Sequence, residues 1–470
     1  MDVGVRHIVF MVIYLFISYF WFFLVAWVNI DAEKKKRNVT LWNTLTFFLG
    51  PLGMFLYELV TSFSKDKPDR PLNQGGVVHS PEETGKDRKI VKIVDKILNN
   101  AVVNRTTDIH MEPSQDRLTI RFRIDGFLHE YGTFPRTEGR AIISAIKVLS
   151  NLDIAQRRSH QDGSFSKTLE DRRIDFRVAI SASQYGETMV IKVLDPKEGL
   201  VDITELGVLP EVEEKFYSLI FRNDGIVLIT GPTGCGKTTT LYAVLNKVNN
   251  LGKNIISIED PIEYNIPNVT QIPINPRAGV TFANSLRSVL RQDPDIIMIG
   301  EIRDIETGKI ALESSLTGHL VFSTFHTKDS VSTITRLVEM GFEPYLISSS
   351  LAGVVSQRLV RLLCPQCRRP YVLPADKCIG HDEIQLKAGE QLYAPRGCSY
   401  CRNTGYRDRT GLFEILVIDK KMKELISKNA KVEEIFTYAK EQGLITLLED
   451  GVRKIREGLT SVEEVESILR

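Results

Sequence analysis

Residues 225–245 have the sequence GIVLITGPTGCGKTTTLYAVL, and this stretch decides the fold. The apolar run at 226–229 predicts a buried β-strand, and the apolar spacing from Thr239 onward predicts a helix. Between them, residues 231–238 fit the pattern G-x-x-x-x-G-K-T. Glycines allow backbone N–H groups to close around phosphate oxygens, and the helix adds the positive end of its dipole. The stretch therefore predicts a phosphate-binding loop between a strand and a helix.

The side chains of this loop indicate a nucleotide with a magnesium ion. Lys237 supplies positive charge for the β- and γ-phosphates, and the Thr238 hydroxyl supplies a hard oxygen for Mg²⁺. Cys235 lies near a helix N-terminus, where a thiol is expected to have a lowered pKa and to be reactive. The alternative is that Cys235 is only a tolerated small residue. We expect ATP and Mg²⁺ to be bound by Gly231, Pro232, Thr233, Gly234, Cys235, Gly236, Lys237, Thr238 and Thr239.

Three further apolar runs, at 255–258, 296–299 and 320–322, each end in reactive side chains. Continuous apolar runs are typical of parallel strands buried on both faces, and ligands bind beyond the carboxyl ends of such strands. In phosphate-loop proteins, an Asp that follows the strand of the Walker B motif usually holds Mg²⁺. At the corresponding position, after the apolar run at 296–299, this chain has Glu301. Its carboxylate can bind Mg²⁺ through water, orient the attacking water, or both. We expect the phosphate loop to share one edge of the sheet with Glu263, Glu301 and His326.

Four of the six cysteines form two C-x₂-C pairs. Each pair can turn two thiolates onto one ion, which predicts a closed, structural Zn²⁺ site at Cys364, Cys367, Cys398 and Cys401. The intervening Cys378 has no matching partner. Disulfides are disfavoured in a reducing cytoplasm. Nucleic-acid binding is another zinc-ribbon role, and several arginines lie nearby, but the net charge of +1 gives no global basic field.

The amino terminus predicts a membrane anchor. Residues 8–30 carry no charge, and at about 1.5 Å per residue they can span a hydrocarbon core of about 30 Å. The run also exceeds the roughly 7–15 apolar residues of a signal peptide. Residues 39–60 are a weaker candidate for a second crossing, a re-entrant segment or an interfacial one. The basic residues at 34–37 favour the cytoplasmic side for the loop between them. Two full crossings would place the ATP-binding part outside, so we expect one.

The length of 470 residues predicts about three domains at roughly 150 residues each. From Ile90 the pattern changes to a helical spacing followed by strand-like alternation, which indicates a small α+β domain. The expected parts are a membrane anchor at 1–62, a flexible linker at 63–88, the α+β domain at 89–200, an ATPase domain at 201–360, a tetracysteine element at 361–412 and a helical region at 413–470.

Over residues 88–470 the chain resembles the type II secretion and type IV pilus assembly ATPases. GPTGCGKTT resembles the Walker A motif of that family. ISIEDPIEY, which ends at Tyr264, resembles its Asp box, and LRQDPDIIMIGEIRD at 290–304 resembles its Walker B region. STFHTKDS at 323–330 resembles its His box. Upstream, TDIHMEP, RFRIDG and QDGSF resemble the domain that precedes the motor.

The resemblance implies an α/β fold with a RecA-like P-loop NTPase domain and a homohexameric ring. It implies that Glu263 activates water, that Glu301 lies beside the metal and that His326 senses the γ-phosphate. In the family, arginines of the preceding domain add charge near the γ-phosphate. Arg177 matches one of them, whereas Lys192 stands where the second is expected, and lysine lacks the planar fork of arginine. Further arginine candidates are Arg287 and Arg291.

The resemblance also implies a biological setting. Assembly and secretion ATPases of the family carry the tetracysteine insert, and their partner is an inner-membrane platform protein. Here the membrane segment stands where many members have a docking domain, so we expect the ring to be tied to the cytoplasmic membrane with the ATPase domain facing the cytoplasm. Two alternatives remain: a membrane-anchored nucleotide-binding scaffold that hydrolyses little ATP, and a motor for DNA uptake or conjugation.

Overall fold

The computed structural model describes residues 85–199, 201–373 and 389–469, together with positions 20, 21, 25, 44, 46, 386 and 387. The chain divides into two compact units, residues 1–82 and 83–470. The expected membrane segments at 8–30 and 39–60 lie almost wholly outside the described residues. Among the residues that are described, no helix has both the length and the apolar character needed to cross a bilayer.

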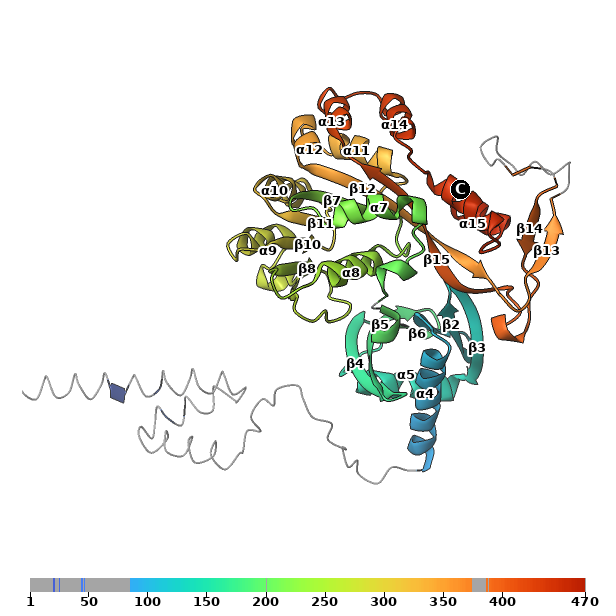
Figure 1. Cartoon of the computed structure of the whole chain (residues 1–470). Coiled ribbons are helices and arrows are strands. Elements are labelled where there is room, and N and C mark those ends of the chain that lie inside the picture. Colours follow the sequence, from blue (N-terminus) through green and yellow to red (C-terminus); the bar gives the residue numbers. More distant parts are fainter. Residues whose placement is uncertain are drawn as a thin grey trace, which may run out of the picture. The chain divides into compact units, whose positions relative to one another are not determined.

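The first part of the second unit is a six-stranded antiparallel sheet with two helices packed against it, which we call the α+β module (Figure 1). The strand order is β3-β2-β1-β6-β5-β4. Alternate residues of β2 are buried, as expected for a strand with one face toward a core. The elements are α4 (Gly85–Val103), β1 (Asp108–Pro113), β2 (Arg117–Ile124), β3 (Phe127–Pro135), α5 (Arg136–Leu149), β4 (Gln161–Leu169), β5 (Arg172–Ser183) and β6 (Gly186–Leu194).

A seven-stranded sheet follows, in the order β15-β12-β7-β11-β10-β8-β9. All of its neighbouring strands run parallel except β15, which is antiparallel to β12. This arrangement confirms the expected α/β fold, with a mixed rather than a purely parallel sheet. The strands are β7 (Gly225–Thr230), β8 (Ile255–Glu259), β9 (Thr270–Pro273), β10 (Ile296–Ile299), β11 (Leu320–Phe325), β12 (Leu351–Leu363) and β15 (Tyr406–Val417).

Helices cover both faces of this sheet. Ile226 and Leu228 of β7 pack with one group of helices, α9 to α12, while Val227 and Ile229 pack with α7 and α8 on the other face. The apolar run of β7 is continuous because both of its faces are buried. The helices and short turns are α6 (Pro196–Gly199), η1 (Ile203–Glu205), α7 (Pro210–Ile220), α8 (Lys237–Val248), η2 (Pro276–Ala278), α9 (Phe282–Val289), α10 (Ile305–Leu316), α11 (Ser330–Glu339) and α12 (Pro344–Ser350).

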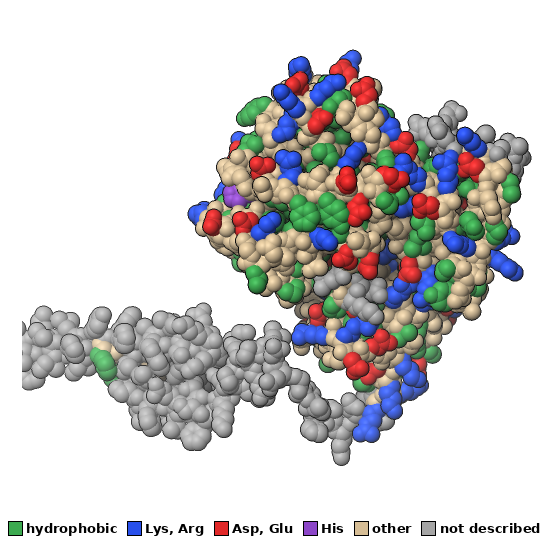
Figure 2. All heavy atoms as spheres, in the orientation of Figure 1, with side chains coloured by type: hydrophobic (Ala, Val, Ile, Leu, Met, Phe, Trp, Pro, Cys, Tyr) green, Lys and Arg blue, Asp and Glu red, His purple; other side chains and the backbone are tan. Residues whose placement is uncertain are grey.

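The carboxyl-terminal part begins with a small element between β12 and β15 and ends in four helices. The boundary expected between residues 412 and 413 falls inside β15, because β15 pairs with β12 from Tyr406 to Val417. The remaining elements are β13 (Arg369–Val372), β14 (Gln391–Ala394), η3 (Ser399–Cys401), α13 (Lys420–Ser427), α14 (Val432–Glu441), α15 (Leu447–Arg456) and α16 (Val462–Leu469). On the face seen in Figure 2, Lys and Arg side chains are interspersed with Asp and Glu, as the net charge of +1 leads one to expect.

A buried ion pair joins α15 to the central sheet. Lys454 Nζ lies 2.7 and 2.9 Å from the two carboxylate oxygens of Asp450 and also donates to the carbonyls of Gly207 and Gly411, at 2.8 Å each. Asp450 in turn accepts a hydrogen bond from the backbone N–H of Phe413 at 2.7 Å. Burial raises the pKa of Asp450 and lowers the pKa of Lys454. Each of the two buried charges is therefore stabilised by its contact with the other.

We predict that Asp450→Ala lowers the free energy of unfolding by about 3–5 kcal/mol, because it leaves the Lys454 charge buried without its partner. Glu339→Ala is the matched control. Glu339 forms an exposed pair with Arg336, and such pairs contribute about 0–1 kcal/mol. Urea unfolding of the full-length variants measures both values. Similar small losses in the two variants would contradict the importance of the buried pair.

Candidate functional site

A cleft of about 910 Å³ lies at the carboxyl ends of the central parallel strands. Glu263, Glu301 and His326 all line it, although they follow three different strands. Lys192 of the α+β module lines it as well. Six residues of the phosphate loop complete this wall: Thr233, Gly234, Gly236, Lys237, Thr238 and Thr239. The structure thus brings together most of the residues that the sequence singles out.

The phosphate loop owes its shape to its glycines. Gly231 has φ 147°, and an added Cβ would lie 2.5 Å from the carbonyl oxygen of Gln357. Gly236 has φ 91° at the start of α8, and its Cβ would lie 2.8 Å from Gln357 Nε2. Lys237 Nζ donates to the carbonyls of Gly231 at 2.8 Å and Pro232 at 2.9 Å. Burial lowers the pKa of this ammonium group. The loop therefore holds the positive charge of Lys237 against its own backbone.

Cys235 does not have the environment that the sequence suggested. Its side chain is buried, and burial raises the pKa of the thiol. Lys237 and Arg358 oppose this rise but do not overcome it. The expectation of a lowered pKa was therefore wrong, because desolvation outweighs the helix terminus at this position.

Two cations of the α+β module hold the carboxylate of Glu263. Lys192 Nζ lies 2.8 Å from Oε1, and Arg177 NH1 lies 3.1 Å from Oε2. Arg177 also donates to the carbonyl of Ile262. Arg177 and Lys192 are direct cross-strand partners on β5 and β6, so the two side chains project from the same face of that sheet. The module is therefore linked to the motor at one of the predicted catalytic carboxylates.

Glu301 and His326 lie together in the cleft. The carboxylate of Glu301 is 2.5 Å from Arg303 NH2 and 3.9 Å from His326 Nε2. Burial, and next the positive charge of Lys237, lower the pKa of His326. A neutral imidazole can both donate and accept a hydrogen bond, whereas the protonated ring can only donate. No sequence pattern pointed to a role for Arg303, although it follows Glu301 by two positions.

Tyr242 and Glu259 form a buried contact that sequence reasoning did not identify. The Tyr242 hydroxyl donates to Glu259 and accepts a hydrogen bond from the backbone N–H of Glu263 at 3.1 Å. Burial raises the pKa of Tyr242, so the hydroxyl stays protonated. Glu259 also accepts bonds from Ser257 Oγ at 2.5 Å and Gln271 Nε2 at 3.0 Å. The contact ties helix α8 to the loop that carries Glu263.

Two of the predicted arginines do not reach this cleft within the chain. Arg287 NH2 lies 2.6 Å from Glu306 Oε1 on the surface and also donates to Asn284. Arg291 is exposed on the segment that follows α9. Neither side chain lines the cleft.

The four predicted metal-binding cysteines converge. Their sulfur atoms all lie within 4.8 Å of one another. The measured separations are 3.8 Å for Cys364–Cys398, 3.7 Å for Cys367–Cys401 and 3.7 Å for Cys398–Cys401. A tetrahedron with Zn–S bonds of about 2.3 Å has edges of about 3.8 Å. Backbone N–H groups of Gly397, Cys398 and Gly405 point at the sulfurs. The donor set therefore fits zinc, while Cys378 lies outside the described residues.

Comparisons with known proteins agree with this geometry. The family model described as "Type II/IV secretion system protein" matches residues 83–467. The chain is 44% identical over 383 residues to the type II secretion system ATPase E of Vibrio cholerae, covering 82% of this chain and 76% of that protein. It is 41% identical over 413 residues to the type IV pilus assembly ATPase PilB of Thermus thermophilus, covering 87% of this chain and 45% of PilB.

A solved structure supports the same assignment. The crystal structure of the pilus retraction motor PilT with bound ADP aligns with a TM-score of 0.55 and 25% identity, over 79% of this chain and 95% of PilT. The family model also covers both the α+β module and the motor. The cleft, the phosphate loop and the tetracysteine element all lie in that matched region. The chain belongs to the type II/IV secretion system protein family of ATPases.

Proposed function

We propose that this protein is the ATP-hydrolysing motor of a type II secretion or type IV pilus assembly system. One observation carries the proposal: the phosphate loop and three reactive side chains from separate strands line a single cleft. An ATPase needs little covalent chemistry from its protein, since positioning and electrostatic stabilisation of the transferred phosphoryl group supply most of the catalysis. The cleft offers both.

Each residue of the cleft has a role in ATP hydrolysis that follows from its position. Lys237 neutralises the β- and γ-phosphates, and the loop N–H groups hold them in place. A magnesium ion supplies further neutralisation of the phosphates when bound, and the Thr238 hydroxyl and the Glu301 carboxylate are the oxygens that would hold it. Glu263 orients the attacking water and accepts its proton. Neutral His326 offers a hydrogen bond to the γ-phosphate.

Arg177 and Lys192 are the two cations that the α+β module contributes to the reaction. In the described structure they pair with Glu263 at the rim of the cleft. When the γ-phosphate is present, their charge stabilises the negative charge that develops there. Arg287 and Arg291 do not line the cleft of their own chain, so any role for them belongs at a neighbouring subunit of a homohexameric ring.

The setting at the membrane is also part of the proposal. Residues 1–62 would anchor the ring at the cytoplasmic membrane, beside an inner-membrane platform protein, with the motor facing the cytoplasm. Residues 63–88 would be the linker to the α+β module at 89–200. The ATPase domain would comprise residues 201–363 together with β15, because the expected boundaries after 360 and 412 fall inside β12 and β15. The zinc element would be inserted between these two strands, and the helical region would follow Val417. The charge pattern at 34–37 and the family of the relatives support this orientation.

Substitutions of Lys237 and Glu301 test the ATPase activity. We predict that Lys237→Ala and Glu301→Gln each lower the rate of ATP hydrolysis by about 100-fold or more, because each removes stabilisation specific to the reacting phosphates. The control Glu339→Ala should keep the activity of the unsubstituted chain. Phosphate release from Mg·ATP by the full-length protein is the measurement. If the unsubstituted chain binds ATP but does not hydrolyse it, the scaffold alternative is correct.

The Tyr242 contact allows a subtler test. We predict that Tyr242→Phe lowers kcat for ATP by about fivefold, because the loop that carries Glu263 loses a hydrogen bond of about 1 kcal/mol. The KM for ATP should change by less than about twofold, since Tyr242 does not hold the phosphates. Tyr185→Phe, outside the cleft, is the control. An unchanged kcat would show that this contact does not position Glu263.

Metal analysis tests the tetracysteine site. We predict about one zinc ion per purified chain and its loss in Cys398→Ser, because three sulfurs leave the tetrahedral site open. The control Cys378→Ser should keep its zinc. Retention of metal in Cys398→Ser, or loss in Cys378→Ser, would overturn the assignment of ligands.

A further inference from the structure

A second contact between the α+β module and the carboxyl-terminal part lies away from Glu263. Residues 402–408, which we call the latch loop, follow the second cysteine pair directly and include the first three residues of β15. Arg402 NH2 donates to the side-chain oxygen of Asn104. The carboxylate of Asp408 pairs with the guanidinium of Arg105, and the backbone N–H of Asp408 donates to Asp125 Oδ2 at 3.2 Å. The latch loop therefore touches two separate turns of the module.

The backbone at these contacts is strained on both sides. Arg105 and Asp125 have φ of 53° and 50°, and Arg402 and Asp408 have φ of 53° and 68°. Side chains other than glycine pay about 1–2 kcal/mol for this left-handed conformation. Such strain persists only where the surrounding structure imposes it, and it concentrates at positions with a function. Asp125 adopts this φ in the Asp-Gly turn between β2 and β3, and Arg402 adopts it at the end of η3, so local turns account for these two values and the junction is defined by its contacts.

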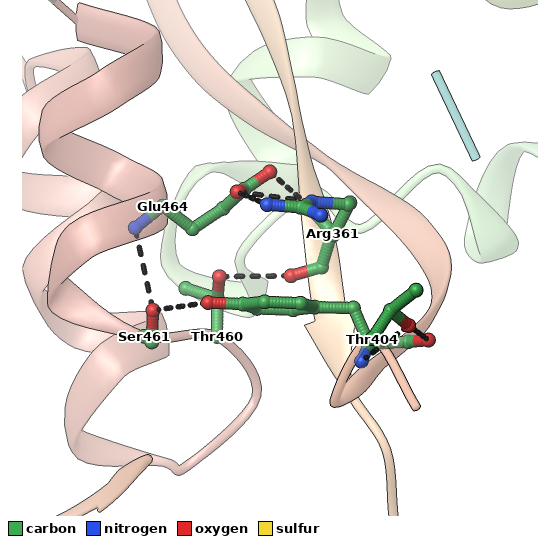
Figure 3. Close-up of polar contacts among 6 residues, drawn as sticks. Arg361, Thr404, Thr460, Ser461 and Glu464 are labelled. Carbon is green, nitrogen blue, oxygen red and sulfur yellow. Dashed lines mark hydrogen bonds and ion pairs between the residues drawn. The ribbon is translucent and has the colours of Figure 1, made fainter. Parts of the chain in front are cut away.

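An arginine stacked between two rings reinforces the junction. The guanidinium of Arg361 lies 3.9 Å from the ring centre of Phe127, in the module, and 4.1 Å from that of Tyr406. Figure 3 shows Arg361 beside Glu464, which accepts hydrogen bonds from its backbone N–H and its guanidinium. Thr460 donates to the Arg361 carbonyl at 2.8 Å. The carboxyl-terminal part thus orients the Arg361 side chain that stacks on Phe127.

Backbone pairing within the module connects this junction to Lys192. Arg105 lies just before β1, and the carbonyl of Thr107, which immediately precedes that strand, accepts a hydrogen bond from the backbone N–H of Val193 at 2.9 Å. The next residue, Asp108, is the register partner of Lys192. A cavity of about 340 Å³ lies between the latch loop and the phosphate loop and is lined by Arg105, Asp125, Asp408, Gly236 and Thr239, among others. The junction and the nucleotide site therefore border the same space.

We propose that Asp408 and Arg105 are positioning residues, and that the latch loop holds the α+β module in the pose that presents Arg177 and Lys192 to the cleft of the same chain. This inference rests on the proposed ATPase function for its kinetic part. Neither residue touches the phosphates or Glu263. Breaking their contact releases the module, so that the two cations are presented less often and kcat falls while nucleotide still binds.

Charge reversal in the full-length protein tests the proposal. Asp408→Arg and Arg105→Asp each place like charges opposite one another, and each should lower kcat for ATP hydrolysis by about fivefold or more. The double variant restores an opposite-charge pair and should recover to within about twofold of the unsubstituted rate. Arginine is strained at position 408, so Asp408→Asn, which keeps a residue tolerant of that φ, provides a milder version. Glu339→Arg, at an unrelated surface pair, should leave kcat unchanged.

Hydrogen exchange separates failure of the latch from failure of the proposed function. In the single variants the amides of residues 104–108 and of Val193 should exchange faster, while those of β7 remain protected. Binding of a fluorescent ADP analogue should stay within about twofold in all variants. If the protein lacks ATPase activity, faster exchange at these amides still supports the latch. Unchanged exchange and kcat in both single variants, or no recovery in the double variant, would overturn it.

Discussion

The parallel pairing of β7, β8, β10 and β11 is the constraint on which the rest of the structure depends. Parallel strands end at one edge of their sheet, so the loops after them share one space. The backbone hydrogen bonds of this sheet therefore bring Lys237, Glu263, Glu301 and His326 together from distant parts of the sequence. The glycines of the phosphate loop add the close backbone approach that phosphate oxygens need. The chemistry of the cleft follows from these two features.

The α+β module forms ion pairs with the rest of its unit at two separate places. Arg177 and Lys192 of the module pair with Glu263. Arg105 of the module pairs with Asp408 of the latch loop. The module can therefore move only when the ion pairs with Glu263 or the ion pair with Asp408 break. Ion pairs at the surface are weak individually, so their exchange for a phosphate partner is energetically accessible. In the homohexameric ring that we propose, this exchange provides a physical route by which nucleotide state can alter the arrangement of the chains.

Local patterns allowed much of the fold and site to be predicted. The α/β class, the phosphate loop, the strand ends and the family follow from runs of a few residues, and the α/β class and family are confirmed. Contacts between distant residues could not be predicted. Nothing in the sequence reports the register that pairs Arg177 with Lys192, or the partnership of Tyr242 with Glu259. The expected pKa of Cys235 was wrong because the degree of burial is a tertiary property.

The most direct test of the central claim is an experimental structure of the full-length protein with Mg²⁺ and a non-hydrolysable ATP analogue. The account predicts that Lys237 Nζ lies within about 3.2 Å of a phosphate oxygen, with Glu301 and His326 on the γ-phosphate side of the same cleft. It also predicts that the α+β module closes over that nucleotide. A nucleotide bound away from the phosphate loop, or a γ-phosphate remote from both Glu301 and Glu263, would contradict the account.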